Sequence, residues 1–152
     1  FLFWCQQLIA ESLGKKGKGM LPTISNSPKD HHSVLQLYLD GPKDKIFYLF
    51  SENVRKSNKI KTNIITKKLD YLNNKDLDDI KIAQKNAIKK VLIKNKIPFR
   101  EFKINSFDEK TLGELFSYFI LETSISGRLV NINPFNQPAV EQVKIFTKKL
   151  LS

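Results

Sequence analysis

The sequence predicts an α/β fold, a three-layer α-β-α sandwich built on a mainly parallel sheet and ending in a C-terminal helix. Short apolar runs that suit strands alternate along the chain with longer stretches of helical periodicity. Such alternation is typical of parallel strands joined by helices that cover both faces of the sheet. The length of 152 residues and the hydrophobic fraction of 41% are enough for one domain with a buried core.

Glycine and proline punctuate the first third of the chain. The expected elements there are a helix over residues 2–13, a short buried strand over 20–25, a helix over 31–39 and a strand over 45–50. Gly14 suits the left-handed position that ends a helix, and Asp30 suits the N-cap of the second helix. Gly41 and Pro42 then end that helix.

The remaining chain is mostly helical in its periodicity. The expected elements are a strand at residues 60–65, a helix at 79–95, a strand at 97–104, a long helix after the turn at 106–109, and a last helix at 138–150. The apolar face of the long helix is predicted to hold Leu112, Leu115, Phe116, Phe119, Ile120 and Thr123. Pro138 suits a first helical position. The last helix is expected to turn Val140, Val143, Thr147 and Leu150 toward the core.

The net charge of +11 is concentrated in one region. Residues 51–100 hold 14 basic and 5 acidic side chains, whereas the rest of the chain is nearly balanced. Lys81, Lys85 and Lys89 recur there at four-residue spacing beside an apolar helix face. A solvated helix face explains this pattern, and aromatic residues are not interleaved as a single-strand nucleic-acid groove requires. We expect no nucleic-acid partner, and a steep salt dependence of DNA or RNA binding would revive that alternative.

Other residue types exclude further classes of protein. The single Cys5 rules out a disulfide within the chain, and two adjacent histidines make no zinc site, so no metal is expected. This scarcity of cysteine indicates a reducing, cytoplasmic setting. No apolar stretch approaches the roughly 20 residues that span a bilayer, so no membrane contact is expected. The chain starts at Phe1, inside an apolar run and without methionine, which indicates a piece of a longer polypeptide.

The first candidate for chemistry is a pair on the first helix. Gln7 and Glu11 are four residues apart, so an amide and a carboxylate project from one face. An ordinary solvent-facing pair explains the same spacing. The glycine- and lysine-containing loop over residues 14–19 follows, but Met20 stands where a phosphate-binding P-loop needs lysine, which excludes that motif.

Two further polar groups lie near expected helix starts. His31 and His32 follow the predicted N-cap, where the helix dipole favours a neutral imidazole that can move a proton near pH 7. Gln137, Glu141 and Lys144 form a polar stripe at the start of the last helix, which suits a polyhydroxy or anionic ligand. Surface histidines and a capped surface helix are the alternatives.

Together these segments resemble the glucose-6-phosphate isomerase family over most of the chain outside its lysine-rich middle. The most specific part is the C-terminal signature, which reads Gly127, Leu129, Val130, then Phe135-Asn136-Gln137, then Ala139-Val140-Glu141 and Lys144. Asn136 stands where Asp is commoner in the family, and Ala139 where Gly often sits. Residues 6–12 resemble the segment that carries the base, residues 30–37 the segment that carries the ring-opening histidine, and residues 111–114 also fit.

The resemblance implies an aldose-ketose isomerase that interconverts glucose 6-phosphate and fructose 6-phosphate in glycolysis and gluconeogenesis, without a cofactor. By position, Glu11 would be the general base, His32 the ring-opening group, and Lys144 its assistant at the ring oxygen. Gln7 and Gln137 would bind the sugar phosphate. One carboxylate can remove the proton from C2 and return it to C1 through an enediol.

The resemblance also implies a sugar isomerase (SIS) fold and a homodimer, with His32 reaching into the partner subunit's site. Residues 1–130 would be part of the second SIS domain, and residues 131–152 the C-terminal active-site loop and helix. The family's phosphate-binding serines and threonines and its enediolate-stabilising arginine lie upstream of the segment resembling Gln7 to Glu11. The sandwich would therefore be incomplete on its N-terminal side, and the isolated chain inactive or weakly active.

A non-catalytic sugar-phosphate-binding or regulatory domain of the same fold is the alternative, because fold alone does not fix activity. The joint presence of Glu11, His32, Gln137 and Lys144 argues against it.

Overall fold

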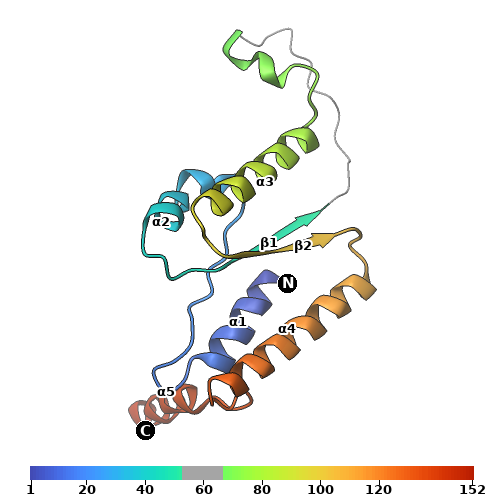
Figure 1. Cartoon of the computed structure of the whole chain (residues 1–152). Coiled ribbons are helices and arrows are strands. Elements are labelled where there is room, and N and C mark those ends of the chain that lie inside the picture. The colour runs from blue at the N-terminus through green and yellow to red at the C-terminus, as the bar shows by residue number, and fades with distance from the viewer. Residues whose placement is uncertain (53–66) are drawn as a thin grey trace. The chain divides into compact units, whose positions relative to one another are not determined.

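The computed structural model describes residues 1–52 and 67–152, so the strand predicted at 60–65 lies outside the described residues. The elements are α1 (Leu2–Leu13), the 3-10 helix η1 (Lys29–His32), α2 (Leu35–Asp40), β1 (Phe47–Glu52), the 3-10 helix η2 (Lys67–Leu72), α3 (Leu77–Lys94), β2 (Phe99–Ile104), α4 (Glu109–Leu129) and α5 (Pro138–Leu151) (Figure 1). The α/β class and the C-terminal helix are confirmed. The full three-layer sandwich and the domain boundary at residue 130 stay predictions.

The chain forms two compact units. One consists of Phe1–Ser25 with Glu109–Ser152, and we call it the helical unit. The other is Asn26–Asp108, which we call the sheet unit because it holds both described strands. Along the described chain no helix is both long and apolar enough to cross a membrane.

The helical unit is built on α1 packed along α4 (Figure 1). Aromatic side chains join the two helices: the rings of Trp4 and Phe116 meet edge to face at 4.5 Å, and Phe1 contacts Phe119 at 5.7 Å. Phe119 is 1% exposed. Aromatic pairs in such geometry contribute about 0.5–1.5 kcal/mol each beyond the area that they bury, so this cluster is the core of the unit.

The buried stripe of α4 is narrower than the predicted apolar face. Phe119, Thr123 and Gly127 are its buried residues, one turn apart. Ile120 points about 100° away from Phe119, and Leu112 lies one turn before the Phe116 contact with α1. Both side chains are therefore exposed, against the prediction.

The sheet unit contains a parallel β-α-β arrangement. β1 and β2 pair in parallel from Phe47 opposite Phe99 to Glu52 opposite Ile104, and α3 belongs to the connection between them, as a parallel crossover requires. Asp76 caps α3 in a capping box with Asp79, which satisfies backbone N–H groups at the helix start. The predicted helix at 79–95 and strand at 97–104 are confirmed with small shifts at their ends.

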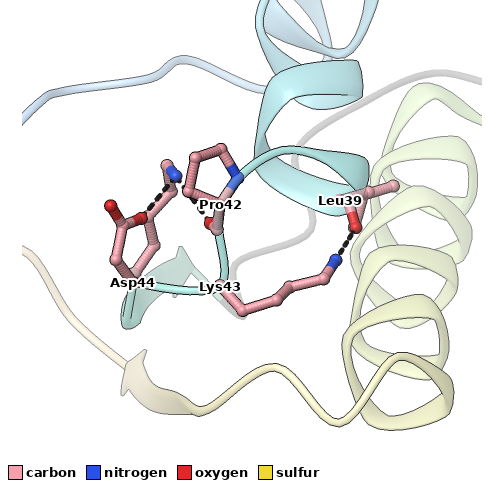
Figure 2. A network of polar contacts seen from close by, with 5 residues as sticks. Leu39, Pro42, Lys43 and Asp44 are labelled. Carbon is pink, nitrogen blue, oxygen red and sulfur yellow. Dashed lines mark hydrogen bonds and ion pairs between the residues drawn. The ribbon is translucent and has the colours of Figure 1, made fainter.

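Polar contacts between α2 and β1 close the turn around Pro42 (Figure 2). The Lys43 ammonium donates to the Leu39 carbonyl in the last turn of α2, where a cation satisfies an unpaired helix carbonyl. Lys45 donates to the Pro42 carbonyl at 2.8 Å and to the Asp44 carboxylate at 2.6 Å. The hydrogen bond from Lys45 lowers the pKa of Asp44. Gly41 ends α2 as predicted.

Two predictions about the segment after the first helix are wrong. Residues 20–25 form no strand, and Leu21 is 84% exposed. No strand of the helical unit lies beside this segment, so it has no partner for β-sheet hydrogen bonds. Gly14 ends α1 with φ of −75°, outside the left-handed region. The backbone reverses instead at Lys16 and Gly17, whose φ angles are 54° and 69°.

The last helix, α5, differs from the prediction in burial rather than in position. It starts at Pro138 as expected. All of its side chains are exposed, however, including Val140, Val143, Thr147 and Leu150, which were expected in the core. The helical unit has no described element against this apolar face.

Candidate functional site

Two glutamine amides hold the carboxylate of Glu11. Gln7 Nε2 donates to Glu11 Oε1 at 3.2 Å, and Gln137 Nε2 donates to Glu11 Oε2 at 2.8 Å. The first contact spans one helical turn, whereas the second joins residues 126 positions apart. Three of the five predicted site residues therefore come together within the helical unit.

The amphipathic pattern of α1 explains why Gln7 and Glu11 are presented outward. Cys5 and Leu13 are the buried residues of the helix, and their side chains project from the side opposite Gln7 and Glu11 at 100° per residue. Glu11 is half-buried and Gln7 is exposed. Burial raises the pKa of the Cys5 thiol to about 11, so this thiol stays protonated near neutral pH and is a poor nucleophile.

The loop over residues 130–137, the 130–137 loop, brings Gln137 to Glu11. It begins at a Schellman stop of α4: Asn131 N–H donates to the Arg128 carbonyl at 3.1 Å, and Ile132 N–H donates to the Gly127 carbonyl at 2.8 Å. Asn131 takes the left-handed conformation with φ of 57°. Ile132 is 4% exposed and anchors the loop.

Gly127 allows the 130–137 loop to fold back closely on α4. A Cβ atom at this position would meet Pro134 Cβ at 3.2 Å and the Ile132 carbonyl oxygen at 3.3 Å, contacts that are too tight for ordinary packing. Gln137 is the N-cap of α5, but its side chain makes no capping hydrogen bond. The amide is thus available to Glu11.

Lysines of the loop after α1 also contact the 130–137 loop. Lys15 Nζ donates to the Asn133 carbonyl at 2.7 Å, and Lys18 Nζ donates to the Val130 carbonyl at 2.8 Å. Sequence reasoning assigned no role to these lysines. The available signal was two lysines in a glycine-rich loop that starts soon after the predicted base.

Lys144 does not join the Glu11 cluster. Its Nζ donates to Glu141 Oε1 at 2.6 Å, in an exposed pair one turn apart on α5. Lys144 also lines a shallow hollow along α5 with Val143 and Thr147, where no other predicted site residue lies. The predicted stripe of Gln137, Glu141 and Lys144 is present, but the Lys144 ammonium is paired with Glu141.

His32 belongs to the sheet unit and is exposed. The helix predicted over residues 31–39 is instead the 3-10 turn η1 followed by α2, which starts only at Leu35. The Asp30 carboxylate accepts the Asn26 N–H at 2.6 Å and so closes the preceding turn instead of capping a helix. His32 therefore does not stand at an α-helix N-terminus, and the dipole argument for its neutral form does not hold. His31 Nε2 lies 3.0 Å from Ser27 Oγ.

The lysine-rich helix α3 uses part of its charge within the sheet unit. Lys89 pairs with Glu101 of β2 at 2.6 Å, and Lys81 pairs with Asp78 at 3.1 Å. The hydrogen bond from Lys89 lowers the pKa of Glu101. Among the described residues no three His, Cys, Asp or Glu side chains gather as a metal site would need.

Comparison with known proteins gives consistent results. No family model matches the chain. The chain is 36% identical over 149 residues to the glucose-6-phosphate isomerase of Methanocaldococcus jannaschii, covering 97% of this chain and 36% of that protein. It is 37% identical over 155 residues to the glucose-6-phosphate isomerase of Campylobacter jejuni, covering 98% of this chain and 38% of that protein. It thus spans about a third of the length of the curated relatives it matches.

A solved structure matches the fold over nearly the whole chain. The crystal structure of a hypothetical protein from Thermus thermophilus superposes with a TM-score of 0.83 at 28% sequence identity, covering 99% of this chain and 38% of that chain. The fold and the site together define an α/β protein in which two glutamine amides hold a glutamate carboxylate, one of them at the end of the 130–137 loop. Its relatives identify it more narrowly: the chain belongs to the glucose-6-phosphate isomerase family.

Proposed function

We propose that this chain contributes the general base of a glucose-6-phosphate isomerase, in a longer protein that interconverts glucose 6-phosphate and fructose 6-phosphate. The observation that supports this best is the Glu11 carboxylate, whose two oxygens accept hydrogen bonds from the neutral amides of Gln7 and Gln137. Within the described residues no ammonium or guanidinium group pairs with it. Such a carboxylate is oriented without being neutralised, as a base must be.

In the proposed reaction, Glu11 takes the proton from C2 of the open-chain aldose. The C2–H electron pair forms the C1–C2 double bond of the enediol, and the carbonyl oxygen O1 takes up a proton. Glu11 then returns its proton to C1, while the O2 proton leaves as the C2 carbonyl forms. The amides of Gln7 and Gln137 would orient Glu11 and bind the sugar phosphate.

Ring opening would precede this step. It requires a proton to move from O1 to the ring oxygen, which we assign to His32 assisted by Lys144, with His32 supplied by the partner subunit of a homodimer. Lys144 would have to exchange Glu141 for the substrate. The serines and threonines that bind the phosphate group and the arginine that stabilises the enediolate would come from residues outside this chain, in a cytoplasmic enzyme of glycolysis and gluconeogenesis that needs no cofactor.

Glu11→Gln in the full-length protein tests the assignment. General acid-base catalysis contributes about 10²- to 10⁴-fold, so we expect kcat to fall by that factor while sugar-phosphate binding persists. A coupled assay measures kcat, and exchange of the C2 hydrogen with deuterated solvent reports proton transfer itself. Glu109→Gln, which removes an exposed carboxylate of the same unit, is the matched control.

Undiminished turnover and C2 exchange in Glu11→Gln would refute the base assignment. A wild-type protein that binds the sugar phosphate without turnover or exchange would instead support the regulatory alternative. The isolated 152-residue chain should show little or no activity, and normal turnover by it would contradict the need for groups outside the chain.

A further inference from the structure

The loop over residues 14–19 and the 130–137 loop are joined by contacts that the proposed chemistry does not itself require. Lys15 Nζ donates to the Asn133 carbonyl at 2.7 Å, and Lys18 Nζ donates to the Val130 carbonyl at 2.8 Å. These residues lie 118 and 112 positions apart in the sequence. Two cations thus fasten one loop to the main chain of the other.

The backbone of the lysine loop fixes the places from which the two side chains start. Lys15 and Lys18 exchange main-chain hydrogen bonds, with Lys18 N–H donating at 2.9 Å and Lys15 N–H at 3.1 Å. Gly19 has φ of 115°, and a Cβ there would lie 2.8 Å from the Leu13 carbonyl oxygen. The loop is therefore a tight turn held against the end of α1.

The acceptors suit cations. Val130 follows the last residue of α4, where unpaired carbonyls carry the negative end of the helix dipole and favour an ammonium. Asn133 uses its side chain on the Phe135 N–H at 3.0 Å, which leaves its main-chain carbonyl to Lys15. Both acceptors are backbone atoms, so each contact fixes the path of the 130–137 loop.

The spacing links these contacts to Glu11. Lys15 follows Glu11 by four residues, and Gln137 follows Asn133 by four residues. The Lys15 contact and the Gln137–Glu11 hydrogen bond therefore tie the same two segments at neighbouring points. We propose that Lys15 and Lys18 are positioning residues, which hold the 130–137 loop so that the Gln137 amide stays on the Glu11 carboxylate. The catalytic consequence rests on the proposed function of Glu11.

The structural part is tested on the 152-residue chain with Lys15→Met/Lys18→Met. Nuclear Overhauser contacts between the Gln137 side-chain amide protons and the Glu11 Hγ protons report the hydrogen bond directly. We expect them in the wild type and their loss in the double variant. Lys16→Met is the matched control, because Lys16 is an exposed lysine of the same loop and its removal changes the charge alone. Retained contacts in the double variant would overturn the proposal.

The kinetic part uses the full-length protein. A displacement of about 1 Å can lower a rate about 100-fold, so kcat of the double variant should fall by about 10- to 100-fold, with a smaller change in KM. Lys15→Arg/Lys18→Arg, which retains donors, should recover most of the rate, and Lys16→Met should keep it. If the double variant does not fold, Lys18→Met alone carries both measurements.

Failure of this proposal is distinct from failure of the proposed function. A large loss of kcat in Glu11→Gln with an unchanged kcat in the double lysine variant would refute the positioning role alone. Full activity of Glu11→Gln would refute the base, while the nuclear Overhauser contacts would still decide whether the lysines place Gln137.

Discussion

Glu11 in the helical unit and Glu101 in the sheet unit are both held in hydrogen bonds, but by different kinds of donor. Glu11 accepts from two neutral amides, whereas Glu101 accepts from the Lys89 ammonium at 2.6 Å. An ammonium keeps a carboxylate ionised and lowers its pKa, as it does for Glu101. An amide orients a carboxylate without supplying a charge. The helical unit therefore offers a carboxylate for chemistry, and the sheet unit uses one for its structure.

The largest predicted losses of stability come from truncating side chains in the cores of the two units. Phe119 in the helical unit and Leu92 in the sheet unit are each 1% exposed. Truncation to alanine should lower the free energy of unfolding by about 3–5 kcal/mol for Phe119 and about 2–5 kcal/mol for Leu92. Urea unfolding measures both.

Exposed neighbours provide the controls for this comparison. Phe135→Ala in the helical unit and Ile93→Ala in the sheet unit remove side chains that are 76% and 63% exposed, so each should cost well under about 1 kcal/mol. Equal costs for Phe119→Ala and Phe135→Ala would show that the aromatic cluster is not the core of its unit.

The next-largest predicted effect distinguishes the carboxylate of Glu101 from that of Glu11. The Glu101 side chain is 14% exposed and that of Lys89 is 26% exposed, so Lys89→Met leaves a largely buried carboxylate without its partner and should cost about 1–2 kcal/mol at pH 7. Glu101 Oε1 is already buried without a partner among the described residues. Glu11→Gln keeps an oxygen acceptor and should cost less than about 0.5 kcal/mol.

The pH dependence gives the sign of the Glu101 contribution. Because the pKa of Glu101 is lowered in the folded state, the unfolded chain binds the proton first as the pH falls. The stabilisation is complete above the ordinary value of 4.5 and is lost progressively below it. Urea unfolding from pH 7 to pH 3 should show this loss in the wild type and a smaller one in Lys89→Met. Equal slopes in both proteins would contradict the ion pair.

The smallest predicted effect concerns the left-handed motif that ends a helix in each of the two units. α3 ends as α4 does: Lys96 is left-handed with φ of 55°, and Ile97 N–H donates to the Leu92 carbonyl at 2.9 Å. Because glycine adopts this conformation without strain, Lys96→Gly should stabilise the chain by about 0.5–1 kcal/mol.

Two other glycine substitutions calibrate that value. Asn131→Gly should gain less, because asparagine tolerates the left-handed conformation better than lysine does. Asn95→Gly, where φ is −88°, should gain nothing. Thermal unfolding compares the three variants, and a stabilisation by Asn95→Gly as large as that by Lys96→Gly would remove the backbone explanation.

Helix periodicity and local stop signals were sufficient to predict most elements. The helices at α1, α3, α4 and α5 and both described strands were anticipated, because their patterns depend on residues close in sequence. Residues 20–25 were misassigned because the apolar run Met20-Leu21 resembles a strand, while strand formation depends on a neighbour that the run itself does not encode. Asp30 was misassigned because an aspartate can close a turn as well as cap a helix.

The candidate site was likewise predictable only where its residues lie close together in the sequence. Gln7 and Glu11 share a helix face, which spacing alone predicts, but the third member, Gln137, is brought there by a contact across 126 positions. Only the resemblance to a known family connected them. Lys15 and Lys18 escaped notice because their acceptors are main-chain carbonyls, which carry no signature in the residue types of the 130–137 loop.

The helix stop at Asn131 also bears on the order in which the chain folds. Its two hydrogen bonds join residues no more than five positions apart, so the loop they close is short and its entropy cost is small. The contacts of Lys15, Lys18 and Glu11 with the 130–137 loop each close more than a hundred residues, and contacts of such separation form slowly. The turn that positions Gln137 should therefore form during folding before the long-range contact between Gln137 and Glu11.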